Sequence, residues 1–205
     1  MGRVVEMEST KLDAPTGIDA RVAWAPGTDA VERIRVLTKE ILADRLQIDG
    51  AFIDVSREAP AQFGHHAQPI ATVDGRPVPV SVRTASFRTA SVVAVASPEL
   101  LVGLDIRDRH PDEAALHEIR SHSHLWDDDS AWNKATPEQL ALHWSRVQAV
   151  RQADPRGVSI RPEQVRLDPP FAKAWTPDRT AAFKLVDLSR NGFVITLAHG
   201  SPATD

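Results

Sequence analysis

The feature that most constrains the fold of this chain is the order of its predicted elements. Each half reads as a strand, then a helix, then further strands. In the first half, a strand is predicted over residues 20–25, and Asp29 followed by Glu32 predicts a capping box at the start of a helix. In the second half, Thr136 followed by Pro137 is typical of a helix N-terminus. This order predicts an α+β fold with two similar lobes.

Short runs rich in β-branched residues predict the remaining strands. Residues 91–96 and 100–106 are two such runs, and the Ser97-Pro98-Glu99 segment between them predicts a hairpin. Prolines and glycines over residues 57–79 indicate a loop with short extended pieces and a turn at Asp74-Gly75. Further strands are predicted over residues 164–167, 181–188 and 192–198, and a helix over residues 111–120.

These elements also give boundaries for the lobes. Residues 1–17 are polar and lack periodicity, so we expect them to form a loose leader. The N-terminal lobe is expected over residues 18–98 and the C-terminal lobe over residues 99–199, followed by a polar tail at 200–205. A chain of 205 residues is long enough to give each lobe a core of its own.

Composition and charge exclude several classes of protein. The chain has no cysteine, which excludes disulfides, a thiolate nucleophile and a cysteine-bound metal. No apolar run approaches the roughly 18 residues of a membrane span. The formal net charge of −4 does not favour bulk nucleic acid or an anionic membrane as a partner. We therefore expect a cytoplasmic monomer that binds neither.

Five short motifs, in a fixed order along the chain, resemble those of one known family. Residues 102–106 are similar to a glycine–x–aspartate–x–glutamate strand, and residues 144–149 to a W-[ST]-x-K-E-A helix. Residues 75–77 resemble a G-K-P turn and residues 86–89 an S-x-S-H-[ST] segment, while residues 192–198 match a closing strand. Together these motifs resemble the 4′-phosphopantetheinyl transferases of the surfactin-synthetase-activating type, over nearly the whole chain.

The resemblance implies a two-lobed, pseudo-symmetric fold with its site in the cleft between the lobes. It also implies transfer of 4′-phosphopantetheine from coenzyme A to a serine of an acyl or peptidyl carrier protein. In the family, three carboxylates hold Mg²⁺ against the pyrophosphate of coenzyme A, two from alternate positions of the strand and one from the helix. This chain keeps the first as Asp105, but Arg107 stands at the second position and Gln148 at the third. Arg88 stands at the family's histidine position and Val147 at that of the helix lysine. These departures argue against Mg²⁺, for which Asp105 would be the one remaining ligand.

The arginines predict a different chemistry at the same positions. Asp105 and Arg107 lie at alternate positions of one strand, so an ion pair between them is expected. Because a guanidinium binds a diphosphate without metal, Arg76, Arg88 and Arg107 are candidate ligands for phosphate or coenzyme A. Asp105 and Gln148 are the candidate catalytic residues. The alternative interpretation is that the arginines are structural remnants of an inactive site.

Other polar residues are weaker candidates for a metal or catalytic site. Asp108 is expected on the opposite face of the strand from Asp105, and residues 127–129 form an acidic run typical of a solvated loop. Glu138 stands too far along its helix to replace a metal ligand. The histidines within residues 117–124 and at 65–66 lack the spacing of metal ligands and are expected on the surface.

Three hypotheses of function remain open on the sequence. The first is a divergent member of the family that acts on or binds a coenzyme A-linked or carrier-protein-linked intermediate in polyketide or nonribosomal peptide metabolism. The second is a working transferase with an unusual metal site. The third is a module that binds a carrier protein without catalysis. Activity that depends on Mg²⁺ would distinguish the working transferase from the other two hypotheses. Catalytic turnover would distinguish the divergent family member from the non-catalytic module.

Overall fold

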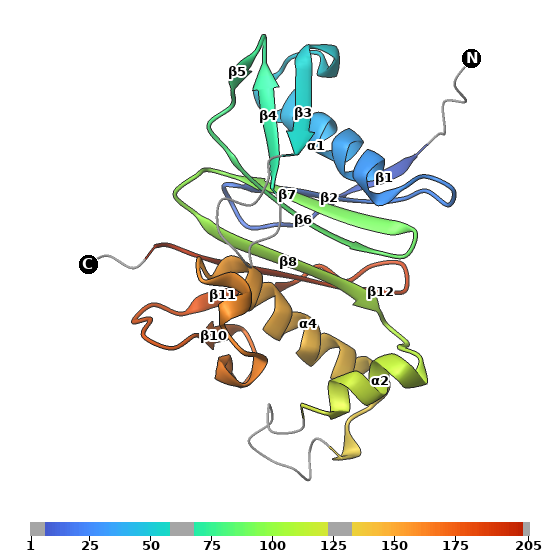
Figure 1. Cartoon of the computed structure of the whole chain (residues 1–205), viewed down its shortest axis with the longest axis vertical. Coiled ribbons are helices and arrows are strands. Elements are labelled where there is room, and N and C mark those ends of the chain that lie inside the picture. Colours follow the sequence, from blue (N-terminus) through green and yellow to red (C-terminus); the bar gives the residue numbers. More distant parts are fainter. Residues whose placement is uncertain (1–6, 58–67, 123–132, 203–205) are drawn as a thin grey trace. The chain divides into compact units, whose positions relative to one another are not determined.

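The computed structural model describes residues 7–57, 68–122 and 133–202. The chain divides into two compact units, Met1–Pro98 and Glu99–Asp205. Each unit combines antiparallel sheet with helix, so the predicted α+β class is confirmed (Figure 1). Within the described ranges, no helix is both long enough and apolar enough to cross a membrane.

The first unit is built on a four-stranded antiparallel sheet and one long helix, α1 (Ala30–Leu46). The strands, in spatial order, are β1 (Glu8–Leu12), β2 (Ile18–Trp24), β7 (Ala90–Ala96) and β6 (Ser81–Phe87). Helix α1, drawn in blue in Figure 1, packs on β7 and β2. Buried side chains of the helix, such as Leu37 and Ile41, share a core with Val93 and Val95 of β7. Apolar burial of this kind supplies most of the free energy of folding.

The start of α1 is fixed by its cap and by a buried arginine. Asp29 accepts a hydrogen bond of 2.8 Å from the backbone N–H of Glu32, as the capping pattern predicts. One turn into the helix, Arg33 is only 2% exposed. Its Nε donates to Ser91 Oγ at 2.9 Å, and its Nη2 donates to the backbone oxygen of Arg88 at 2.9 Å. The helix is therefore tied to the turn that joins β6 to β7.

A three-stranded sheet completes the first unit. Its strands, in order, are β3 (Ile53–Arg57), β4 (Pro69–Val73) and β5 (Arg76–Pro77), and the short helix η1 (Gly50–Phe52) precedes β3. The predicted turn at Asp74-Gly75 is confirmed, since it joins β4 to β5 with φ values of 49° and 74°. Glycine tolerates such a φ without steric cost, which explains its use at this turn.

The second unit is built on a five-stranded antiparallel sheet covered by the helix α4 (Pro137–Ala153). The strands, in spatial order, are β8 (Leu101–Asp108), β12 (Phe193–Gly200), β11 (Phe183–Asp187), β10 (Lys173–Trp175) and β9 (Arg166–Asp168). Helix α4 packs on β8 and β12, and the shorter α2 (Glu113–Arg120) packs on α4. The short helices η3 (Gly157–Ser159) and η4 (Pro162–Gln164) follow α4.

The N-terminus of α4 confirms the prediction made from its first residues. Thr136 Oγ1 accepts a hydrogen bond from the backbone N–H of Gln139 at 3.2 Å, and Gln139 Oε1 accepts one from the backbone N–H of Thr136 at 2.8 Å. This reciprocal pair is a complete capping box, with Pro137 at the first helical position. The helix therefore begins at a residue that the sequence alone identifies.

Strand β8 and helix α4 approach each other closely at Gly103. A Cβ at this position would lie 2.0 Å from the backbone oxygen of Ala149 and 2.4 Å from the backbone N of Ala153. Glycine is therefore the residue that this packing requires. Because side chains alternate along a strand, Asp105 and Arg107 lie on the same face of β8 as Gly103, the face toward α4.

Two predictions about the strands of the first unit are wrong. The expected loose leader at 1–17 contains β1, which pairs with β2 over five residues. The expected hairpin of residues 91–96 and 100–106 does not form either. Both edges of β7 are already paired, one with β2 and the other with β6, while β8 pairs with β12 in the second unit. A strand with two partners has no edge left for the strand that follows it.

Three further strands, besides β1, were not predicted from the sequence. Strand β6 carries serine, arginine and threonine and lacks the apolar run used to recognise its partner β7. Strand β10 has only three residues, too few to show a period. Strand β3 has two apolar residues among five. In each case the local composition is ordinary for a loop, and pairing with neighbouring strands decides the structure.

Candidate functional site

Asp105 and Arg107 form the ion pair that the strand pattern predicts. Arg107 Nε lies 3.0 Å from Asp105 Oδ2, and Nη2 lies 3.4 Å from Oδ1. The Asp105 side chain is 15% exposed and that of Arg107 is 30% exposed. The Asp105 side chain is thus largely enclosed, while more of the Arg107 side chain reaches solvent.

The surroundings of Asp105 make it an unusually weak acid for an aspartate. Burial raises its pKa from 3.8 to about 6, and Arg107 and the Ser145 hydroxyl hold it below the value that burial alone would give. Ser145 belongs to α4 and is fully buried. Thr196, the cross-strand partner of Asp105 on β12, is 1% exposed. The site is therefore a buried polar cluster between β8, β12 and α4.

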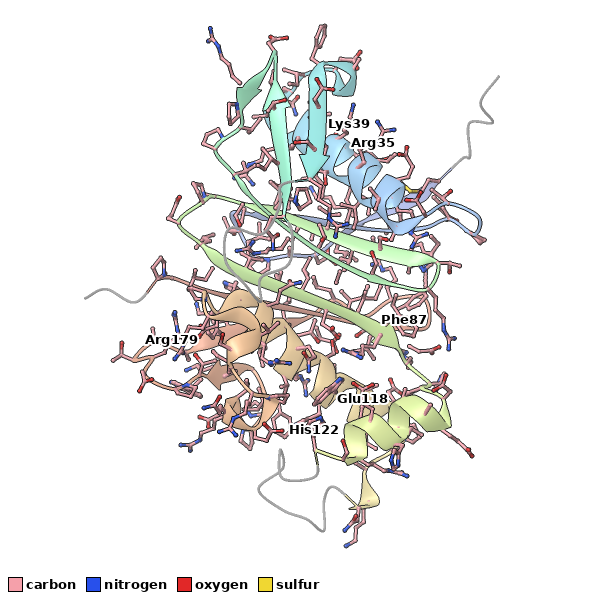
Figure 2. The ribbon with its side chains drawn as sticks, viewed as in Figure 1. Arg35, Lys39, Phe87, Glu118, His122 and Arg179 are labelled. Atoms are coloured by element: carbon pink, nitrogen blue, oxygen red, sulfur yellow. The ribbon has the colours of Figure 1, made fainter. Side chains whose placement is uncertain are left out.

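An aromatic ring covers the guanidinium of Arg107. The Cζ atom of Arg107 lies 6.0 Å from the centroid of the Trp144 ring, at the outer limit of a cation–π contact. His122 stacks on the same indole with a centroid distance of 4.7 Å, and its Nδ1 lies 2.9 Å from Glu163 Oε1. Figure 2 shows His122 directly beyond α2, the helix that carries Glu118. Trp144 thus links the ion pair to the end of α2.

His122 is partly exposed at the surface, as expected, but it also has partners within the second unit. Its side chain is 27% exposed, and it is held between Trp144 and Glu163. No period or spacing in the sequence identifies these partners, because Glu163 is 41 residues away from His122. His117 is exposed on α2, whereas His124 and residues 65–66 lie outside the described residues.

Gln148, the second candidate catalytic residue, is also engaged within the second unit. Its Oε1 accepts a hydrogen bond of 2.8 Å from Arg151 Nη1, and Arg151 Nε donates to the backbone oxygen of Ile160 at 2.6 Å. The neighbouring Val147 is fully buried in the core. The amide oxygen of Gln148 is therefore already hydrogen-bonded. Position 147 faces an apolar interior that would not accept a charged lysine.

Arg76 and Arg88 belong to the first unit, Arg76 to the three-stranded sheet and Arg88 to a turn of the four-stranded one. Arg76 is exposed in β5. Arg88 is exposed in the turn between β6 and β7, with a φ of 51°, and its Cζ lies 5.1 Å from the centroid of the Phe87 ring. Figure 2 labels Phe87 at the end of β6. Of the candidate residues, the structure brings Asp105 and Arg107 into contact.

The donor set around Asp105 does not fit a magnesium ion. Mg²⁺ prefers several hard oxygen ligands in octahedral geometry. Asp105 is the one carboxylate of the set, and both of its oxygens are engaged by the cation of Arg107. Glu138 lies 3.3 Å from Arg109 Nε, and Asp108 accepts from the backbone N–H of His110 at 3.0 Å, so each has another partner. The acidic run at 127–129 lies outside the described residues.

The arrangement can perform one clear chemical task, the binding of an anion. A guanidinium has five N–H donors, and Asp105 uses the donors on Nε and Nη2 of Arg107. The other N–H groups of Arg107 are not used by Asp105 and could donate to a phosphate or carboxylate oxygen. No known protein-family model matches the chain, and no curated protein matches it. The function is therefore argued from the geometry and from the motifs.

Proposed function

We propose that the chain is a phosphopantetheinyl-transferase-like protein, with the two-lobed fold of that family, in which the Mg²⁺-dependent transfer is lost or altered. It acts on or binds a coenzyme A-linked or carrier-protein-linked intermediate of polyketide or nonribosomal peptide metabolism in the cytoplasm. The proposal rests on the order of the five motifs and on the residues that stand at the family's metal positions.

The observation that carries the proposal is the contact between Arg107 and Asp105. In the family, both positions are carboxylates that neutralise the pyrophosphate of coenzyme A through Mg²⁺. Here the second position supplies a cation directly, and Asp105 orients it at 3.0 Å. A fixed guanidinium neutralises phosphate charge without metal and binds its oxygens in two places at once. This exchange preserves affinity for a phosphate group while removing the metal.

Catalysis of the usual transfer has weaker support in the same geometry. The reaction needs stabilisation of charge on the phosphoryl group and a base for the attacking hydroxyl. Gln148 stands where the family has a glutamate, and an amide cannot accept a proton from a hydroxyl near neutral pH. The carrier protein is the expected macromolecular partner in this proposal.

Titration of coenzyme A into protein treated with EDTA tests the binding role. We expect saturable binding without metal, weakened at higher salt because charge contributes to it. Arg107→Ala should raise the dissociation constant at least about tenfold, the loss expected for one charged hydrogen bond. Arg166→Ala is a matched control, because this arginine is 79% exposed on β9 and far along the sheet from β8. Binding that is unchanged by Arg107→Ala would contradict the proposal.

Mass spectrometry of an apo-carrier protein incubated with the chain, coenzyme A and Mg²⁺ tests the loss of transfer. We expect no gain of the phosphopantetheine mass at ordinary transferase rates. A second reaction should contain the double variant Arg107→Glu with Gln148→Glu, which restores both carboxylates. Rapid Mg²⁺-dependent modification by the natural chain would instead support a working transferase with an unusual metal site.

A further inference from the structure

A second candidate binding site lies wholly within the first unit. A cavity of about 500 Å³ opens beside α1, within the size range of small-molecule sites. It is lined by two rows of residues on α1 together with Ser9 of β1, Arg21 of β2 and Gly50 of η1. None of the residues assigned to the proposed function contributes to it.

The acidic side chains of this cavity already have partners. Asp44 Oδ2 lies 2.6 Å from Arg21 Nη2, and Glu40 Oε2 lies 3.6 Å from Arg21 Nη1. Glu40 Oε2 also accepts a hydrogen bond of 2.6 Å from Ser9 Oγ. This network occupies Arg21, Glu40 and Asp44 with one another. A cationic ligand would therefore have to break existing ion pairs, and the cavity does not favour one.

The cations on the other row of α1 are less occupied. Arg35 and Lys39 stand four residues apart, so they are neighbours on one helix face, and Figure 2 shows both side chains along α1. Arg35 uses Nε and Nη2 to contact Glu32, at 2.9 Å and 2.7 Å, which leaves Nη1 available. Lys39 makes no hydrogen bond or ion pair within the described part of the chain. It is half-buried and lines the cavity, and its charge, after the hydrogen bond from Arg35, helps to lower the pKa of Glu32.

We propose that this cavity binds a small phosphorylated molecule, with the phosphate held by Lys39 and Arg35. The N–H donors of two side chains one helical turn apart can bind the three terminal oxygens of a phosphate ester, whereas a carboxylate offers two oxygens. The hydrogen bonds to Glu32 hold Arg35 in place. Less conformational entropy of this long side chain is therefore lost when a ligand binds. The remaining wall is small and apolar, from Val36 and Ala43, and accepts the carbon part of the ligand.

Nuclear magnetic resonance of the full chain carrying Arg107→Ala tests this site apart from the proposed function. The probes are inorganic pyrophosphate and ribose 5-phosphate. We expect both to move the backbone amide signals of Ala43 and Gly50. Adding Lys39→Gln, which keeps most of the side-chain length, should raise the dissociation constant at least about tenfold. Lys173→Gln on β10 is the control for a lost surface charge, and it should leave the dissociation constant unchanged.

Two outcomes would overturn the proposal. The first is the absence of movement at Ala43 and Gly50, or movement that Lys39→Gln does not weaken. The second is equal binding of succinate, which would show that the cavity does not select phosphate. A melting temperature recorded for each variant identifies any loss of fold, and Lys39→Arg should then recover binding if charge at this position is what matters. Failure here would leave the coenzyme A titration of the Arg107 site unaffected.

Discussion

Arg33 donates a hydrogen bond of 2.9 Å to the hydroxyl of Ser91, which lies 58 residues further along the chain. We predict that Arg33→Met lowers the free energy of unfolding by about 3 kcal/mol, because Ser91 and the backbone oxygen of Arg88 both lose a charged donor. Urea denaturation measures the change. The control is Arg35→Met, which removes an exposed pair with Glu32 and should cost less than about 1 kcal/mol. Equal losses in the two variants would contradict the assigned role of Arg33.

The close packing of β8 on α4 predicts a large effect of one methyl group. Gly103→Ala should lower the free energy of unfolding by about 3 kcal/mol or more, because its Cβ would overlap the backbone of Ala149 and Ala153. Backbone atoms of a helix cannot move aside as a flexible side chain can. The matched control is Gly50→Ala, whose Cβ would meet Ala43 Cβ at an ordinary 3.9 Å. Thermal denaturation of both variants tests the contrast, and an equally stable Gly103→Ala variant would contradict this packing.

Asp154 anchors the end of α4 through Thr176 and Arg156. Thr176 Oγ1 donates to Asp154 Oδ2 at 2.6 Å, and Arg156 contacts both carboxylate oxygens at 3.0 Å. Burial raises the pKa of Asp154, but these hydrogen bonds outweigh it and leave the pKa below 3.8. Asp154→Asn should lower the free energy of unfolding by about 3 kcal/mol near neutral pH.

The pH dependence of this loss has a definite sign. Because folding lowers the pKa of Asp154, the ionised carboxylate stabilises the folded chain above about pH 4. This stabilisation is lost as the pH falls further. The difference in the free energy of unfolding between the natural chain and Asp154→Asn should therefore become smaller in acid. Asp178 also pairs with Arg156, at 3.6 Å, but is 92% exposed, so Asp178→Asn should change little. If this difference in the free energy of unfolding stayed constant from neutral pH to pH 3, the stabilising role of the ionised Asp154 would be contradicted.

Asp105 should show the opposite dependence on pH. Its pKa is about 6 in the folded chain against 3.8 without burial, so the folded chain holds the extra proton between these values. Stability from Asp105 is therefore greatest below about pH 4 and falls by about 3 kcal/mol as the pH rises through 6. Asp105→Asn should remove this part of the pH profile, measured by urea denaturation. Asp108→Asn, which keeps an acceptor for the His110 amide, should retain it.

The helices could be predicted from the sequence because their signals are local. Asp29 and Thr136 each cap a helix whose first residues identify them, and both helices begin where the sequence places them. The pairing of strands could not be predicted in the same way. Ser97-Pro98-Glu99 is suited to a tight turn, yet the edges of β7 are taken by β2 and β6. Strands distant in sequence compete for the same edge, and no pattern in the neighbouring residues indicates which of them will pair there.

The candidate site likewise has a part that could be predicted from the sequence and a part that could not. The ion pair of Asp105 with Arg107 follows from their alternate positions on one strand, so the sequence was sufficient to predict it. The contacts of Trp144 with Arg107 and His122 bring together three elements, and nothing in the local sequence marks them. The cavity beside α1 was likewise not predicted, because it depends on how Ser9 and Arg21 are placed by β1 and β2.

The glycine contact between β8 and α4 has a consequence for how such a protein changes over evolutionary time. It fixes the spacing of the strand and helix backbones independently of the side chains at 105, 107 and 148. The side chains at those three positions can therefore change in charge while the scaffold stays intact. In the laboratory, the same independence means that a few substitutions at these positions can exchange one ligand chemistry for another without redesigning the backbone.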